Sequence, residues 1–358
     1  MTEQEIETLQ SSICNILTEL EDRALVLYEV RTACKKASES FTGRNIDGIK
    51  ANVLKNKSET DLTKLHKIVM GLLSEHVSFD DKMISIYPEQ DNIRQIEKAL
   101  EKSFSATPKD KAKYACMSKT TLSGQRTLYQ FSTGRKVKVR KNLTSSEIKK
   151  AFKKGIFEEY DQIIAVASKY LKCYDFLILD NTNNRIIIGV DQASILGHLQ
   201  AMSSKSQLLQ FLSNDLGIRL DKNTAVDFFP KIRTFYKLPE DGTNGVIQIT
   251  FETPSGTTHE EGARKSCKDL RSATYHKKGA EGVRDEKDKE QKIPLNNDIT
   301  PYKITSKFYR NNRNHLEVSL KSSYIAITSP NSKHLFDAFI KESRNENDLD
   351  FAIDKLIS

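Results

Sequence analysis

Residues 174–191 read YDFLILDNTNNRIIIGVD, and they carry the clearest secondary-structure pattern in the chain. Two runs that are almost continuously apolar flank the four residues from Asn181 to Asn184, which tolerate the backbone conformations of a tight turn. The pattern therefore predicts a β-hairpin. Because apolar residues occupy successive positions, both faces of each strand should be covered, and we expect the hairpin at the centre of a sheet.

Further strands and helices are predicted around this hairpin. Apolar and polar residues alternate in residues 245–256, and shorter apolar runs lie at Tyr302–Phe308 and Leu316–Leu320, which predicts strands. Helices are expected at residues 160–171, 192–215 and 258–277, and a closing helix should contain Leu335, Phe336, Phe339 and Ile340. Residues 278–298 carry charges of both signs without an apolar period, and this composition predicts a flexible loop.

The N-terminal part of the chain has the periodicity of amphipathic helices. Apolar residues recur every three or four positions through the first forty residues, which predicts one long helix. The same spacing predicts a second helix at Ser58–Glu75 and a third after Pro88. We therefore expect an α+β protein, with an acidic helical domain in residues 1–105 and a basic domain in residues 106–358 that contains a mainly antiparallel sheet.

Composition argues against several classes of protein. The 358 residues carry a net charge of +8 and are 37% hydrophobic, so a folded core is expected. The chain has no run of about 18 apolar residues, its first ten residues do not resemble a secretory signal, and its five cysteines are scattered singly. Neither a phosphate-binding glycine loop nor a metal-ligand spacing occurs. We expect a cytoplasmic protein with no membrane partner, no cofactor and no metal.

The basic charge is concentrated in residues 134–155, GRKVKVRKNLTSSEIKKAFKKG, which hold nine Lys or Arg residues and one acid, Glu147. A hairpin turn is expected around Ser132–Gly134, and alternation in the following strand places its valines on one side and its cations on the other. Thr144 and Glu147 have the spacing of a capping box, which predicts the start of a helix with four outward lysines. Two adjacent cationic elements should bind the phosphates of a polyanion.

A second basic segment lies at residues 301–315, PYKITSKFYRNNRNH, where four cations and no acid are interleaved with three aromatic residues. Aromatic rings can stack on unpaired bases while the cations follow the backbone. An equally weighted alternative is a strand with buried aromatic residues and an exposed tip. The predicted nucleic-acid-binding residues of the two segments are Arg135, Lys136, Lys138, Arg140, Lys141, Lys149, Lys150, Lys153, Lys154, Lys303, Lys307, Arg310 and Arg313.

These patterns favour a nucleic-acid-binding protein that contacts the phosphate backbone largely without sequence specificity, with DNA expected over RNA. The helical domain would then provide self-association or a protein partner. An accessory bacterial role in phage defence or mobile-element biology is a hypothesis that rests only on the lack of housekeeping motifs. An alternative function is a protein–protein interaction module whose lysines serve solubility.

A metal-dependent nuclease is the other alternative, and it would need carboxylates that converge on a metal ion. The residues that end or flank predicted strands are Asp180, Asp191, Glu252, Glu317 and Lys321. Glu317 and Lys321 are four residues apart, which on a strand is too far for one small site. His259, Glu260 and Glu261 should lie in the first turn of the 258–277 helix, where the helix dipole favours acids. The sequence therefore argues against an enzyme.

Overall fold

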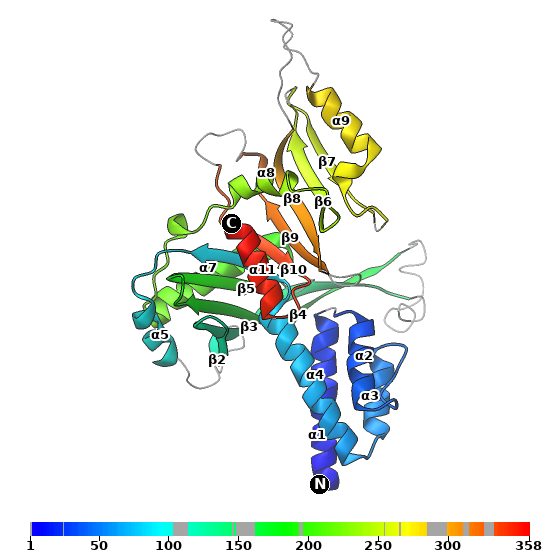
Figure 1. Ribbon diagram of the computed structural model, residues 1–358. Helices are drawn as coiled ribbons and strands as arrows, with labels where there is room; N and C mark the ends of the chain where they lie inside the picture. Colours follow the sequence, from blue (N-terminus) through cyan, green and yellow to red (C-terminus); the bar gives the residue numbers. More distant parts are fainter. Residues whose placement is uncertain are drawn as a thin grey trace, which may run out of the picture.

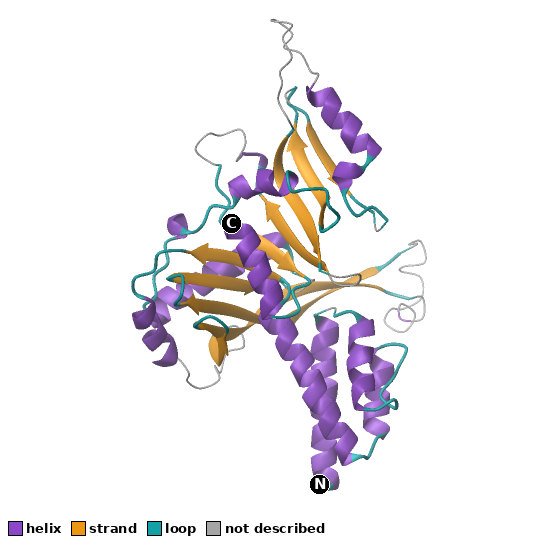
Figure 2. Ribbon diagram, viewed as in Figure 1, coloured by secondary structure: helices purple, strands orange, loops and turns teal. Residues whose placement is uncertain are grey.

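The computed structural model describes residues 2–23, 25–102, 114–144, 147, 162–192, 196–253, 255–264, 266–284, 299–310, 315–325 and 333–358. The fold is α+β, with helices at the N-terminus followed by a strand-rich region (Figure 1). Figure 2 shows the strands gathered in one twisted sheet, with the N-terminal helices packed at one side of it. The predicted fold class is confirmed.

Within the described residues, ten strands form one antiparallel sheet in the order β2-β3-β4-β5-β1-β10-β9-β8-β6-β7. The strands are β1 (Lys82–Tyr87), β2 (Ala115–Leu122), β3 (Arg126–Asn142), β4 (Ile164–Asp180), β5 (Arg185–Asp191), β6 (Asn244–Glu252), β7 (Thr258–Gly262), β8 (Thr300–Tyr309), β9 (His315–Lys321) and β10 (Ala338–Lys341). The hairpin predicted at residues 174–191 is β4–β5, with its turn at residues 181–184. The strands predicted at 245–256, Tyr302–Phe308 and Leu316–Leu320 are β6, β8 and β9.

Helices cover both faces of the β4–β5 hairpin, which explains why both runs are apolar. On one face, Leu177 and Ile188 pack with residues of α5 (Ile93–Lys102) and α7 (His198–Leu216). On the other face, Phe176 and Ile187 pack with residues of α8 (Phe229–Tyr236) and α11 (Glu346–Ile357). Gly189 lies opposite Phe176, and a Cβ atom there would come within 2.2 Å of the aromatic ring, so the packing requires glycine.

The N-terminal bundle consists of α1 (Glu3–Asp22), α2 (Leu27–Ala37), α3 (Ile46–Lys55) and α4 (Glu59–Phe79). These helices share a buried apolar cluster to which β4 contributes Tyr174. The helix predicted at Ser58–Glu75 is α4, and the Ser58 hydroxyl accepts a hydrogen bond from the backbone of Asp61 as its N-cap. Figure 1 shows the bundle, in blue, beneath the sheet.

The single helix predicted for the first forty residues is wrong, because α1 ends at Asp22 and α2 begins at Leu27. Arg23 follows the last residue of α1, and its side chain points into the protein and is 0% exposed. Residues 1–105 also contain a strand that the sequence pattern does not predict. This strand, β1, has six residues, is buried at every position and pairs with β5 and β10. A strand this short between two helices leaves little periodicity to detect.

Two predictions next to the basic stretch are also wrong. The described part of the helix predicted at 160–171, residues 162–171, is not helical, because β4 begins at Ile164 and pairs along its whole length with β3. The turn expected at Ser132–Gly134 lies inside β3, and the chain reverses instead between β2 and β3 at residues 123–125. Gly124 and Gln125 have φ angles of 65° and 57° there, so this turn depends on the left-handed conformation that glycine favours.

The polar helix predicted at 258–277 is instead β7, followed by a 3-10 turn at Leu270–Ser272 and by α9 (Thr274–Arg284). β7 is the edge strand of the sheet, so its polarity reflects exposure to solvent. The helix expected at residues 335–340 is not formed, because residues 338–340 belong to β10 and the residues before them are a loop. The last helix, α11, begins at Glu346. In the predicted loop at 278–298, α9 continues to Arg284, and residues 285–298 lie outside the described residues.

Candidate nucleic-acid interface

The distal parts of β3 and β4 form a two-stranded ribbon that extends from the sheet. Pairing with β2 ends at Ser132, and pairing with β5 begins at Phe176. Among the described residues, positions 133–142 of β3 and 164–173 of β4 therefore pair only with each other. We call these two segments the arm. Figure 1 shows the arm leaving the sheet above the N-terminal bundle.

One face of the arm is exposed, cationic and partly aromatic. Lys136 and Lys138 of β3 and Lys172 of β4 are exposed, and Tyr170 is 60% exposed. Tyr170 lies directly opposite Lys136, so the ring is close to the cations of the neighbouring strand. The arm contains no Asp or Glu residue. These side chains therefore form a surface that combines positive charge with an accessible aromatic ring.

The structure corrects the prediction for Arg135, which lies on the opposite face of the arm and is 5% exposed. Its guanidinium forms an ion pair with Asp175 and donates a hydrogen bond of 2.6 Å to the backbone oxygen of Asp191. A guanidinium committed to these acceptors is not part of an exposed phosphate-binding surface. The physical reason is strand alternation, which places Arg135 on the side of Val137, a residue that packs with Leu171.

A buried ionic cluster fixes the base of the arm to the bundle and to the sheet. Arg23 donates two hydrogen bonds to Asp191, of 2.8 and 2.9 Å, and Lys82 lies 3.7 Å from the same carboxylate. Asp191 also accepts a 2.8 Å hydrogen bond from the backbone of Tyr174 in β4. Burial opposes the ionisation of Asp191, but the two cations outweigh it and hold the pKa of the carboxyl well below its usual range.

The first turn of α7 supports the buried face of the arm. The amide of Gln200 donates a 2.9 Å hydrogen bond to the backbone oxygen of Lys136, and Leu196, just before the helix, packs against Val137 and Cys173. The buried ionic cluster and the start of α7 together hold the base of the arm, so the exposed lysines of the arm have a fixed position relative to the sheet.

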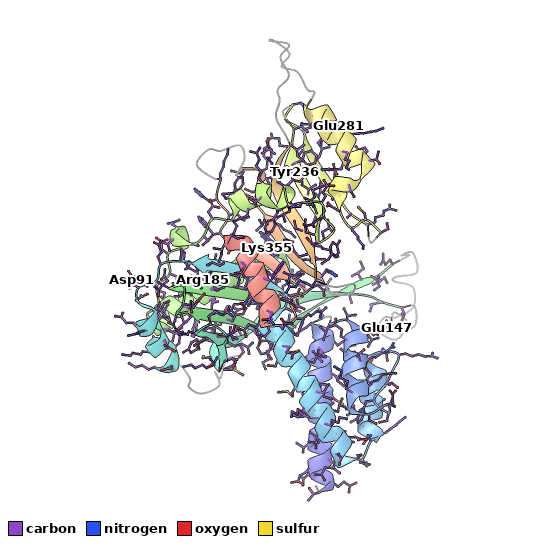
Figure 3. The ribbon with its side chains drawn as sticks, viewed as in Figure 1. Asp91, Glu147, Arg185, Tyr236, Glu281 and Lys355 are labelled. Atoms are coloured by element: carbon purple, nitrogen blue, oxygen red, sulfur yellow. The ribbon has the colours of Figure 1, made fainter. Side chains whose placement is uncertain are left out.

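The capping box predicted at Thr144 and Glu147 is confirmed. The backbone of Thr144 donates to the Glu147 carboxylate at 3.0 Å, and the backbone of Glu147 donates to the Thr144 hydroxyl at 3.4 Å. Figure 3 labels Glu147 near the distal end of the arm. The predicted binding residues Lys149, Lys150, Lys153, Lys154 and Arg313 lie outside the described residues, as do the side chains of Arg140 and Lys141.

The second basic segment does not form the predicted stacking surface. Tyr302 and Phe308 are 4% and 3% exposed, so they belong to the core and offer no face to a base. Lys307 pairs with Glu317 at 3.0 Å. Arg310 lies 4.2 Å from the ring centroid of Phe351 and 3.7 Å from Asp348. Of the predicted residues in this segment, Lys303 faces a cavity that is described below.

The acids proposed for a nuclease do not come together. Asp191 is buried in the ionic cluster, and Asp180 accepts hydrogen bonds from Asn183 and Arg185 within the β4–β5 turn. The hydroxyl of Tyr324 donates to Glu252 at 3.2 Å. Glu317 is paired with a lysine, and although burial opposes its ionisation, hydrogen bonds from His315 and Lys307 lower its pKa to about 2. The described part of the chain contains no group of three or more acidic, His or Cys side chains that could hold a metal ion.

His259, Glu260 and Glu261 lie on the edge strand β7 and not on a helix. The imidazole of His276, which is 4% exposed, is hydrogen-bonded to Glu261 at 2.7 Å and to the Tyr236 hydroxyl at 3.0 Å. These contacts join α9 to β7 and α8, so a structural role explains why His276 is buried.

In comparisons with known proteins, no protein-family model matches the chain, and no curated protein matches it significantly. Among the helices that the structure describes, none combines the length and apolar character needed to cross a membrane.

Proposed function

We propose that the protein binds nucleic acid through the arm, largely without sequence specificity. The proposal rests on one observation, the exposed face on which Lys136, Lys138 and Lys172 surround Tyr170. Lysines supply point charges for phosphate oxygens, and such contacts give affinity without reading the sequence. A two-stranded β-ribbon also has the dimensions to enter the major groove of a duplex.

Three features favour phosphate binding over a surface that only serves solubility. The cations lie on a ribbon that stands out from the sheet, where a long polymer can approach them. The arm has no acidic residue to neutralise them, whereas soluble surfaces usually mix both signs. The ring of Tyr170 is 60% exposed beside Lys136, although burial of aromatic residues is favourable. Bases stack on such rings, and the adjacent cations hold the backbone.

Fluorescence anisotropy with a labelled duplex and a labelled single strand of the same sequence tests this proposal. The double variant Lys136→Glu, Lys138→Glu should weaken binding to both probes by at least about tenfold, because it replaces attraction with repulsion. The matched control is Lys64→Glu, Lys67→Glu, which changes the same charges on exposed positions of α4. Equal effects of the two double variants would overturn the assignment of the arm.

A second variant separates the two contributions of the arm. Tyr170→Ala should weaken binding to the single strand by about tenfold, which is the loss expected for one stacked base. Binding to the duplex should change much less, because paired bases are not available for stacking. DNA and RNA versions of both probes test the prediction that DNA is the preferred partner.

The roles proposed for the helical bundle, self-association or binding of a protein partner, do not depend on nucleic-acid binding by the arm. Self-association would appear as a change in molecular mass with concentration in light scattering. An accessory role in phage defence or mobile-element biology stays a hypothesis, as does a cytoplasmic location.

A further inference from the structure

A cavity of about 510 Å³ lies on the polar face formed by β6, β8 and β9, next to the first residue of α7. Its lining includes His198, Gln248, Thr250, Lys303, Thr305 and Lys321. This volume falls within the range of sites for small ligands and is larger than a simple inorganic anion requires. The lining combines two cations with hydroxyl and amide groups, which is the donor set of an anion site.

Two lysines of the cavity are placed against each other. Lys303 of β8 and Lys321 of β9 are direct cross-strand partners, an arrangement in which like charges are destabilising. No carboxylate of the described residues lies within ion-pair distance of either ammonium group. Burial, Lys341 and Lys303 lower the pKa of Lys321, in that order of importance. Glu317 and Glu260 act on Lys321 in the opposite direction without forming an ion pair with it, so what the two lysines lack among the described residues is a carboxylate in direct contact.

His198 also lines the same cavity. Its Nδ1 atom is buried and has no hydrogen-bond partner among the described residues, although most buried polar atoms have one. Burial and then Lys321 lower the pKa of His198, so a bound anion would favour its protonated, hydrogen-bond-donating form. The carboxylate of Glu260 also lines the cavity, but it accepts a 3.0 Å hydrogen bond from Gln248.

We propose that this cavity binds the phosphomonoester of a nucleotide, with Lys303 and Lys321 as the cationic ligands. A phosphomonoester carries a charge of about −1.5 to −2 at neutral pH, which matches two lysines better than the single charge of a phosphodiester does. The remaining volume accommodates a nucleoside, and Tyr324, which is 45% exposed at the cavity, provides a ring for base stacking. The phosphomonoester can belong to a free mononucleotide or to the end of a nucleic-acid strand.

The cavity and the arm are separate sites, although α7 contributes a residue to each of them. His198 lines the cavity, whereas Gln200, two residues later in α7, holds the arm at Lys136. Nucleotide binding in the cavity therefore requires none of the exposed lysines of the arm. The variant Lys136→Glu, Lys138→Glu should retain it, so the two proposals can fail separately.

Isothermal titration calorimetry with AMP, adenosine and inorganic phosphate tests the proposal. AMP should bind at least about tenfold more tightly than adenosine, and Lys303→Met and Lys321→Met should each weaken AMP binding by about tenfold or more. Lys278→Met, at an exposed position of α9, is the matched control. Both cavity variants should be at least as thermally stable as the original protein, because each removes a like-charge contact.

Two oligonucleotides that differ only in a 5′-phosphate identify the source of the phosphomonoester, and they are added to the arm variant so that the arm does not contribute. Displacement of AMP only by the phosphorylated oligonucleotide assigns the site to a strand end. Displacement by neither, with AMP still bound, assigns it to a free mononucleotide. Equal binding of AMP and adenosine, or AMP affinity unchanged in both lysine variants, would overturn the proposal.

Discussion

Replacement of Asp191 with asparagine should strongly destabilise the protein. Both side chains of the Arg23–Asp191 pair are 0% exposed, and Lys82 lies 3.7 Å from the same carboxylate. Asparagine keeps an oxygen that can accept the hydrogen bond from the backbone of Tyr174, so the substitution mainly removes charge. Arg23 and Lys82 would then remain buried beside a neutral amide.

The expected loss follows from the distances. Two unit charges about 4 Å apart interact by about 4 kcal/mol at an effective dielectric constant of about 20, and Asp191 has two such cations. The desolvation of the carboxylate and the repulsion between the cations offset part of this sum. Removing one partner of a buried pair typically costs about 3–5 kcal/mol, and we expect that range for Asp191→Asn. A domain is stable by only about 5–15 kcal/mol, so the effect should be large.

Urea unfolding followed by circular dichroism measures this loss as a change in the midpoint at a constant slope. The double variant Arg23→Gln, Asp191→Asn should lose less than the sum of the single variants, because the two residues interact directly. Glu39→Gln is the control, since Glu39 forms an exposed pair with Lys35 at 3.4 Å and should have no measurable effect. A loss below about 1 kcal/mol for Asp191→Asn would refute the reasoning.

Two further predictions concern other charged groups of the fold. Burial, with the neighbouring Asp80, raises the pKa of Asp81 to about 6, so stability should fall as pH rises from the unfolded value of about 4 through 6. Asp81→Asn should therefore raise the free energy of unfolding at about pH 7 by on the order of 1–2 kcal/mol, which appears as a higher thermal midpoint. At about pH 4 the substitution should leave the midpoint unchanged. Equal gains at both pH values would contradict this prediction. Arg126 joins β3 to α11 through 2.7 Å contacts with Glu346 and Asp350. Arg126→Ala should therefore lower the free energy of unfolding in urea by about 1–3 kcal/mol, and Arg126→Lys should lower it less. An unaltered urea midpoint for Arg126→Ala would argue against this contact between β3 and α11.

The sequence could predict those elements whose signal comes from residues close together in the chain. The β4–β5 hairpin could be recognised because its apolar runs and its four-residue turn are contiguous, and the capping box at Thr144 and Glu147 depends on a spacing of three residues. The distal half of β4 was misread as helix, because Ala165, Ala167 and Ser168 give no strong alternation. It is a strand because β3 supplies a partner over its whole length.

The site residues that were missed or misplaced depend on contacts between distant parts of the chain. Arg135 resembles the other cations in sequence, and its burial becomes clear only with Asp175, forty residues later. Tyr170 lies in the segment whose pattern predicts a helix, and Lys172 directly follows that segment, so neither residue is placed beside the cations of β3 by the sequence. The opposition of Lys303 and Lys321 depends on the register between β8 and β9, which residue types alone do not determine.

The salt dependence of nucleic-acid binding tests the role of the arm most directly. The logarithm of the association constant for a duplex should fall linearly with the logarithm of the salt concentration, with a slope of about 0.9 per phosphate contacted. Replacing Lys136, Lys138 and Lys172 with alanine removes three of these contacts, so the slope should become shallower by about 2 to 3 units. Lys64→Ala, Lys67→Ala should leave the slope unchanged. An unchanged slope in the triple arm variant would contradict the account.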